Sequence, residues 1–120
     1  AIAILVSGNK TEFVKKMNEK AKELNLQNTQ FANVVGLYDK NNYSSAYDLA
    51  LLMKYAMNLY DFVIITSTKN IVVKTDQKTY DWTNKNKLLF EYKYTTGGKT
   101  GYTKKAKRTL VTSASKNDIN

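Results

Sequence analysis

Apolar residues recur at helical spacing in two stretches of the first half of the chain. In the first stretch, Asn9 is followed three residues later by Glu12, which is the spacing of a capping box at the start of a helix. We therefore expect a helix from position 10 onward, with an inner apolar stripe made of Phe13, Val14, Met17, Ala21 and Leu24. The lysines between these positions fall on the opposite, solvent-facing side.

The second stretch predicts a helix that opens at Ser44 or Ser45, carries Asp48 in its first turn and ends near Asn58. Its inner stripe consists of Ala46, Leu49, Ala50, Met53, Ala56 and Met57. A polar connector joins the two helices. Its few apolar side chains should hold it in place, with a turn at Gly36.

Beyond the second helix the pattern changes to β-branched and aromatic residues, which favour strands. At residues 62–66 periodicity does not separate a short buried helix from a strand, and both remain open. The rest predicts a hairpin of residues 71–75 and 78–82, then two strands at 97–103 and 108–115 joined by a basic turn. Helices first and antiparallel strands last indicate an α+β fold.

The chain gives no sign of an internal domain boundary. Its 120 residues include no proline, and its five glycines fall at a few turn positions, so no flexible linker divides it. No apolar run is long enough to cross a bilayer, and residues 1–7 lack the basic start and small-residue exit of a signal peptide. We therefore expect a soluble piece that is one domain or part of one.

The chain has neither cysteine nor histidine. These absences exclude disulfides, thiolate metal sites, the common zinc sites and a Ser-His-Asp triad. Acid–base chemistry near neutral pH must therefore use lysine, tyrosine or a carboxylate, or residues outside this chain. We expect no metal and no cofactor.

The formal charge of +9 is concentrated in the last third of the chain. Residues 1–84 hold ten lysines against eight acids, whereas residues 85–116 hold nine lysines or arginines against Glu91 alone. Such a field favours anionic partners, including nucleic acid, a membrane surface, an anionic cell-wall polymer or a substrate carboxylate. Charge alone does not choose among them.

Lys99, Thr100 and Gly101 lie together on an expected strand. Lys99 offers a fixed positive charge, Thr100 a hydroxyl donor, and Gly101 room for an extended substrate along the strand edge. Such a strand is suited to a peptide that ends in a carboxylate. The same letters do not make a phosphate-binding loop, because the position that needs its first glycine is Lys93 and no helical pattern follows.

Six ordered segments carry a further resemblance, and together they cover almost the whole chain. They are residues 13–21 with Leu24 and Leu26, then 28–31, 36–37, 43–50, 83–89 and 98–103. In order and spacing they resemble the serine-type D-alanyl-D-alanine carboxypeptidases, the low-molecular-mass penicillin-binding proteins. The last segment holds the Lys-Thr-Gly of that family.

The resemblance implies an enzyme that removes the terminal D-Ala from peptidoglycan stem peptides through a serine acyl-enzyme, and that β-lactam antibiotics trap. It implies that Lys99 supplies charge at the reacting centre and that Thr100 and Gly101 bind the end of the substrate. The backbone N–H of Tyr102 would form half of the oxyanion hole. Lys85 stands where some relatives have arginine, and a second charge toward the substrate carboxylate and an ordinary surface lysine are equal alternatives for it.

Of the three motifs of that family, only Lys-Thr-Gly is present. Ser113 has a lysine three residues later but follows the Lys-Thr-Gly strand, whereas the family nucleophile precedes it. Ser7 also has such a lysine, and with Asn9 it spells Ser-x-Asn, but a turn and a helix cap explain these residues. We expect Ser7 to be an exposed, ordinary hydroxyl, with no activating base and no oxyanion hole.

The resemblance therefore describes residues 1–120 as a partial catalytic domain without the Ser-x-x-Lys and Ser-x-Asn segments. We expect this piece to be inactive alone and to self-associate through a bare sheet edge or helix face. The complete enzyme would act outside the cytoplasm, in the bacterial cell envelope, secreted or anchored to the membrane.

Other functions remain open at this point. One is a catalytically dead or β-lactamase-like relative that kept the fold. Another is a basic nucleic-acid-binding module that stacks bases on Phe90, Tyr92, Tyr94 and Tyr102, although such aromatic residues more often belong to a core. We expect no nucleic-acid partner.

Overall fold

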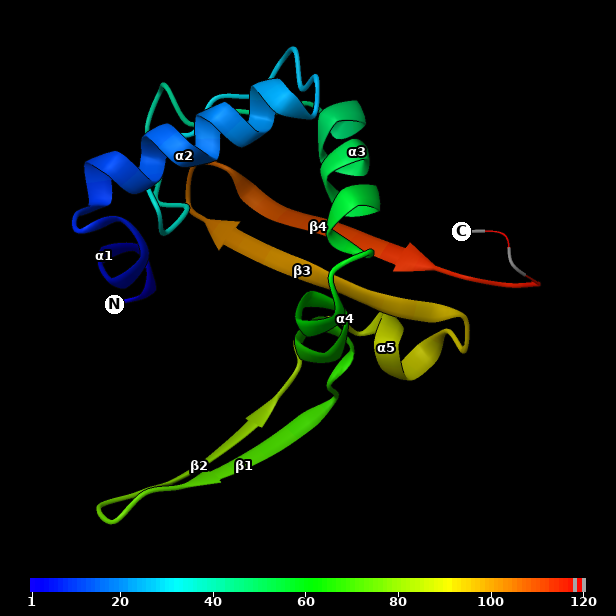
Figure 1. Cartoon of the computed structure of the whole chain (residues 1–120). Helices are drawn as coiled ribbons and strands as arrows, with labels where there is room; N and C mark the ends of the chain where they lie inside the picture. Colours follow the sequence, from blue (N-terminus) through cyan, green and yellow to red (C-terminus); the bar gives the residue numbers. More distant parts are fainter. Residues whose placement is uncertain (118, 120) are drawn as a thin grey trace. The chain divides into compact units, whose positions relative to one another are not determined.

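The computed structural model describes residues 1–117 and 119 (Figure 1). The chain forms two compact units. The first comprises Ala1–Lys54 and Thr103–Lys107, and the second comprises Tyr55–Tyr102 and the chain from Arg108 onward. The first unit is mainly helical, whereas the second holds nearly all of the strand residues.

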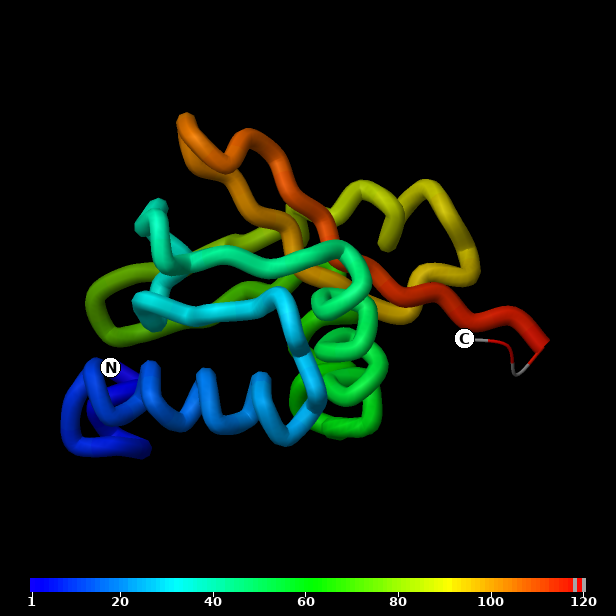
Figure 2. Tube along the Cα trace, turned by 90° about the horizontal axis from the view of Figure 1, so that it is seen from above, coloured from blue at the N-terminus to red at the C-terminus, as the bar shows by residue number. Residues whose placement is uncertain are grey.

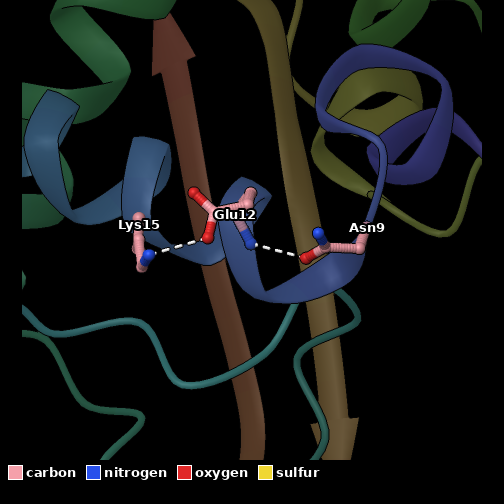
Figure 3. A network of polar contacts seen from close by, with 3 residues as sticks. All are labelled: Asn9, Glu12 and Lys15. Carbon is pink, nitrogen blue, oxygen red and sulfur yellow. Dashed lines mark hydrogen bonds and ion pairs between the residues drawn. The ribbon is translucent and has the colours of Figure 1, made fainter.

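The first unit begins with two consecutive helices, α1 (Ile2–Ser7) and α2 (Lys10–Glu23). Asn9 caps α2 as predicted, because its Oδ1 accepts a hydrogen bond from the backbone N–H of Glu12 at 2.9 Å (Figure 3). The Glu12 carboxylate accepts a second hydrogen bond, from Lys15 Nζ at 2.7 Å. This contact raises the pKa of the Lys15 ammonium, so the ion pair survives to higher pH than a free lysine would allow.

The connector that follows α2 is held in place, as predicted. The Asn18 side chain bonds twice to Phe31: Oδ1 accepts from its N–H and Nδ2 donates to its carbonyl, each at 2.8 Å. Gln30 and Tyr43 form an isolated antiparallel bridge. The turn predicted at Gly36 is confirmed by its φ of 74°, which a glycine adopts without strain.

The third helix, α3 (Ala46–Ala56), starts at its predicted serine cap. Ser45 Oγ accepts a hydrogen bond from the N–H of Asp48 at 3.1 Å. The Asp48 side chain is only 1% exposed, and its carboxylate accepts from the N–H of Asn28 and the hydroxyl of Thr29, both at 2.7 Å. Asp48 therefore does more than the sequence indicated: it ties the start of the connector to α3.

The predicted apolar stripe of α3 is partly wrong. Met53 and Ala56 are buried, but Ala46 and Ala50 are exposed. The reason is that Asp48 is buried, so the side of the helix that carries Asp48 faces inward. Ala46 and Ala50 do not lie on that side and stay exposed.

The second unit opens with α4 (Tyr60–Ser67), so residues 62–66 are helical. The predicted hairpin follows, with β1 (Asn70–Lys74) antiparallel to β2 (Thr79–Thr83). Every residue of β1 is exposed, and the hairpin projects away from α4 (Figure 1).

A short helix, α5 (Leu88–Glu91), leads into β3 (Thr95–Thr103) and β4 (Lys107–Ala114). These two strands form a second sheet and run side by side (Figure 2). Their short connection makes the pairing antiparallel. Both strands were predicted, and the α+β class is confirmed, whereas the four residues of α5 are too few to show a helical period.

Few of the described apolar side chains are buried, namely Ala3, Ala21, Leu26, Met53, Ala56 and Leu89. Others lie open on helices: Leu5 of α1 is 86% exposed and Ile65 of α4 is 71% exposed. No single described helix is long and apolar enough to cross a membrane, and α3 and α4 reach that length only together, across a break. The exposed apolar faces mark surfaces suited to further contacts.

Candidate functional site

The residues singled out from the sequence lie consecutively on β3, from Lys99 to Tyr102. Lys99, Gly101 and Tyr102 are exposed, and Thr100 is half-buried. Within the part of the chain that the structure describes, β3 has β4 as its only neighbouring strand. Its other edge is open in the sense that no strand pairs with it, and an extended peptide can add to such an edge through main-chain hydrogen bonds.

The Lys99 ammonium lies against its own strand, where Nζ donates a hydrogen bond to the carbonyl of Thr100. Ion pairs among residues 1–117 and 119 join Lys15 to Glu12 and Lys20 to Glu23, and none involves Lys99. The charge of Lys99 is therefore not neutralised by a carboxylate of the described chain. A positive charge so placed favours an anionic substrate group at this edge.

Gly101 has a structural reason to lack a side chain. A Cβ atom built there would lie 2.6 Å from Thr109 Oγ1 on β4, which is closer than such atoms approach. Absence of a side chain thus keeps the two strands close at this point. The room for a substrate that the sequence suggested for Gly101 stays a prediction.

Lys85 is exposed on the loop between β2 and α5, flanked by two asparagines that anchor this loop. Asn84 Nδ2 donates to the carbonyls of Thr66 at 3.3 Å and Thr68 at 3.0 Å, which fastens the loop to the end of α4. On the other side, Asn86 Nδ2 donates to Thr112 Oγ1 of β4 at 3.2 Å. The loop that carries Lys85 is therefore held between α4 and the β3–β4 sheet.

Two buried glycines precede Lys99 on β3. A Cβ atom at Gly97 would lie 2.6 Å from Thr66 Oγ1 of α4, and one at Gly98 would lie 2.9 Å from Asn86 Nδ2. Gly98 also has a φ of 156°. Both glycines thus let α4 and the Lys85 loop pack directly on the backbone that leads into Lys99.

The site is an open strand edge rather than a deep pocket. Two shallow hollows of about 260 and 180 Å³ lie elsewhere, and no residue of β3 lines either one. Among the described residues, no group of three acidic side chains lies close enough to hold a metal ion.

Neither serine with a lysine three residues later belongs to a catalytic pair in the structure. Ser113 is half-buried on β4, where its hydroxyl pairs with that of Thr96 at 2.7 Å. Ser7 ends α1, and Gly8 and Asn9 form the predicted turn and cap before α2. The expectation that Ser7 is exposed was wrong: it is half-buried, and its hydroxyl is buried with no hydrogen-bond partner among the described residues. The cause is the tight turn between the two helices, which folds α1 against α2.

The aromatic residues of the basic region lie mostly at the surface, although such residues more often belong to a core. Phe90, Tyr92 and Tyr102 are exposed, and Tyr94 is half-buried. Tyr92 and Tyr94 pack edge to face with ring centroids 5.4 Å apart. Lysines lie over two of the rings, Lys69 over Phe90 and both Lys93 and Lys116 over Tyr94.

Sequence reasoning missed the polar residues that hold the site together. Asn84, Asn86, Thr66 and Thr112 had no assigned role, although the partly buried bonds between them link α4, the Lys85 loop and β4. A signal existed in the two asparagines that flank Lys85 and in the pair of glycines before Lys99. The hydrogen-bond partners of these asparagines lie far away in the sequence, so the sequence pattern alone does not reveal them.

Comparison with known proteins gives consistent matches. The sequence model of the D-alanyl-D-alanine carboxypeptidase family matches residues 1–120. D-alanyl-D-alanine carboxypeptidase DacF of Bacillus subtilis is 42% identical over 120 residues, which are 99% of this chain and 31% of that protein. DacA of Haemophilus influenzae is 36% identical over 116 residues, 95% of this chain and 28% of that protein. The chain thus spans less than a third of the length of these relatives.

Solved structures agree with the sequence matches. A D-alanyl-D-alanine carboxypeptidase from Mycobacterium tuberculosis superposes with a TM-score of 0.84 at 31% identity, covering 95% of this chain and 44% of that one. Penicillin-binding protein 5 from Haemophilus influenzae gives a TM-score of 0.86 at 34% identity, covering 98% of this chain and 33% of that one. The fold of the chain is therefore that of a part of these enzymes.

Proposed function

Because this chain belongs to the D-alanyl-D-alanine carboxypeptidase family, we propose that it is part of an enzyme that removes the terminal D-Ala from peptidoglycan stem peptides. The single observation that carries this proposal is the position of Lys99, Thr100 and Gly101. They lie on β3, whose other edge pairs with no strand among the described residues, in a chain whose whole length matches the family. The edge accepts an extended peptide, and the lysine attracts its carboxylate end.

The reaction proceeds in two steps through a serine outside residues 1–120. The serine hydroxyl attacks the carbonyl of the D-Ala-D-Ala amide, and its proton passes to a neighbouring base. The base then gives this proton to the leaving nitrogen as the amide C–N bond breaks and D-Ala is released. Water then hydrolyses the acyl-enzyme and frees the shortened peptide. A β-lactam acylates the same serine, so β-lactam antibiotics are ligands of the complete enzyme.

The residues of β3 bind the substrate and stabilise the oxyanion, and none of them is the nucleophile. Lys99 supplies positive charge beside the reacting centre, and the backbone N–H of Tyr102 donates one of the two hydrogen bonds to the oxyanion. The hydroxyl of Thr100 donates to the terminal carboxylate of the substrate, and Gly101 leaves the strand edge free for its backbone. The second oxyanion donor comes with the serine.

Lys85 adds a second positive charge toward the substrate carboxylate in this proposal. Support for it comes from the anchored loop, because Asn84 and Asn86 on either side hold the backbone of Lys85 in place. A preorganised charge costs less reorganisation at the moment of binding than a mobile one. A solvated surface lysine would not need two anchored neighbours.

The substrate also sets the place of action. Peptidoglycan lies outside the cytoplasm, so we place the complete enzyme in the cell envelope, secreted or membrane-anchored. A nucleic-acid-binding role is not favoured, since the relatives and structures that match are DD-peptidases.

The test is release of D-Ala by the complete gene product from a pentapeptide that ends in D-Ala-D-Ala. We expect one D-Ala per peptide and a tetrapeptide product, with no release from the same peptide ending in D-Ala-L-Ala. A purified, folded product that releases nothing from either peptide is a catalytically dead relative, and the proposal is then wrong.

A further inference from the structure

We propose that Asn86 is a positioning residue that, through Thr112, fixes the start of the Lys99 strand against the loop carrying Lys85. This proposal rests on the function proposed above. It concerns a side chain that does not touch the substrate and acts through the groups that do.

Asn86 is 1% exposed, and both polar atoms of its side chain form hydrogen bonds. Its Oδ1 accepts from the N–H of Leu88 at 3.2 Å, and its Nδ2 donates to Thr112 Oγ1 at 3.2 Å. The Thr112 hydroxyl in turn donates to the carbonyl of Gly97 at 2.8 Å. Two successive hydrogen bonds therefore run from the Lys85 loop, through β4, to the backbone of β3 just before Lys99.

The contact with β3 is also tight in the steric sense. Asn86 Nδ2 would lie 2.9 Å from a Cβ atom at Gly98, and the carbonyl oxygen of Val111 would lie 2.5 Å from the same atom. Only a residue without a side chain allows the amide to reach Thr112 past this backbone. Gly98 is the residue directly before Lys99, so the packing leaves little freedom for the strand at that point.

The loop is fixed at its other end as well. The N–H of Asn84 donates to the carbonyl of Lys69 at 2.7 Å, and its side-chain amide donates to Thr66 and Thr68. Both backbone neighbours of Lys85 are thus anchored within the same unit of the fold. Buried polar groups of this kind hold one geometry, because any alternative leaves a donor or acceptor unpaired.

The fixed geometry matters for substrate binding because, in the proposed function, Lys85 and Thr100 bind the same carboxylate of the substrate. These residues sit on different segments, and a shared ligand requires a fixed spacing between them. A displacement of about 1 Å in a substrate-positioning group can cost two orders of magnitude in rate. The bonds from Asn86 through Thr112 to Gly97 are the direct link that sets this spacing.

The test compares Thr112→Val with Thr112→Ser in the complete gene product. Valine has nearly the same shape but removes both hydrogen bonds, whereas serine keeps the hydroxyl. The readout is the ratio of kcat/KM for a D-Ala-D-Ala peptide with a free carboxylate to kcat/KM for the same peptide with a C-terminal amide. This ratio does not depend on the fraction of folded enzyme.

We expect Thr112→Val to lower this ratio about tenfold, and Thr112→Ser to keep it near the wild-type value. Asn86→Leu, which keeps the approximate shape but loses the Nδ2 donor without adding a charge, should lower the ratio as valine does, and it serves if the valine variant does not fold. If the enzyme is active and neither Thr112→Val nor the Asn86 variant changes the ratio, these residues have a merely structural role. That result overturns this proposal and leaves the proposed function standing. A wild-type product that cleaves neither peptide overturns the proposed function and this proposal with it.

Discussion

Lys99, Thr100 and Gly101 concentrate the proposed chemistry of this chain in three contiguous residues of β3. These adjacent residues provide the charge, the hydroxyl and the missing side chain, and the strand that carries them is recognisable from its own sequence. The pairing of Asn86 with Thr112 could not be predicted from the sequence, because the two residues are separated by 26 positions. A buried asparagine looks like a surface residue until its partner in the fold is known.

The first prediction concerns the charge of Lys99. In the complete enzyme, Lys99→Ala should lower the rate of acylation by a β-lactam about a hundredfold, as expected for removal of a preorganised charge at the reacting centre. Stopped-flow or quenched labelling measures this rate. Lys74→Ala on the exposed strand β1 removes the same charge elsewhere and should leave the rate unchanged. Equal rates in the two variants would show that Lys99 has no special role.

At the scale of elements, the parts fixed by local chemistry were predicted well. The cap at Asn9, the turn at Gly36 and the β1–β2 hairpin all depend on residues within a few positions of one another. The buried face of α3 was predicted less well, because Asp48 takes its partners from a segment 20 positions away. The short helix α5 was missed because a single turn has no periodicity.

The second prediction concerns the helix cap of α2. Asn9→Ala removes the acceptor for the Glu12 N–H and should lower the free energy of unfolding by about 1 kcal/mol. Asn9→Asp retains an acceptor oxygen and should stay within a few tenths of wild type. Urea denaturation of the two variants gives this comparison. If alanine and aspartate are equally stable, the bond drawn in Figure 3 contributes nothing.

At the scale of the molecule, the family resemblance was the part of the sequence that carried most information. It is confirmed by the family match over residues 1–120 and by relatives that are 42% and 36% identical to the chain over the 120 and 116 residues that align. The sequence did not predict how much apolar surface stays uncovered on α1 and α4, because periodicity shows which face is apolar and not what lies against it.

The third prediction concerns assembly of residues 1–120 as an isolated chain. The open edge of β3 and the exposed apolar residues of α1 should make it self-associate. Sedimentation across a wide concentration range should show dimers or larger species, and Leu5→Glu should weaken them if α1 forms the contact. A compact monomer at every concentration would count against this prediction.

The most direct test of the proposed acyl-enzyme is the site at which a fluorescent penicillin attaches. Intact mass and peptide mapping of the complete gene product should show one adduct per molecule, on a serine of a Ser-x-x-Lys segment outside residues 1–120. The isolated chain should show none, because neither Ser7 nor Ser113 has an activating base beside it. An adduct on Ser7 that is lost in Ser7→Ala, or no adduct on the folded complete product, would contradict the assignment.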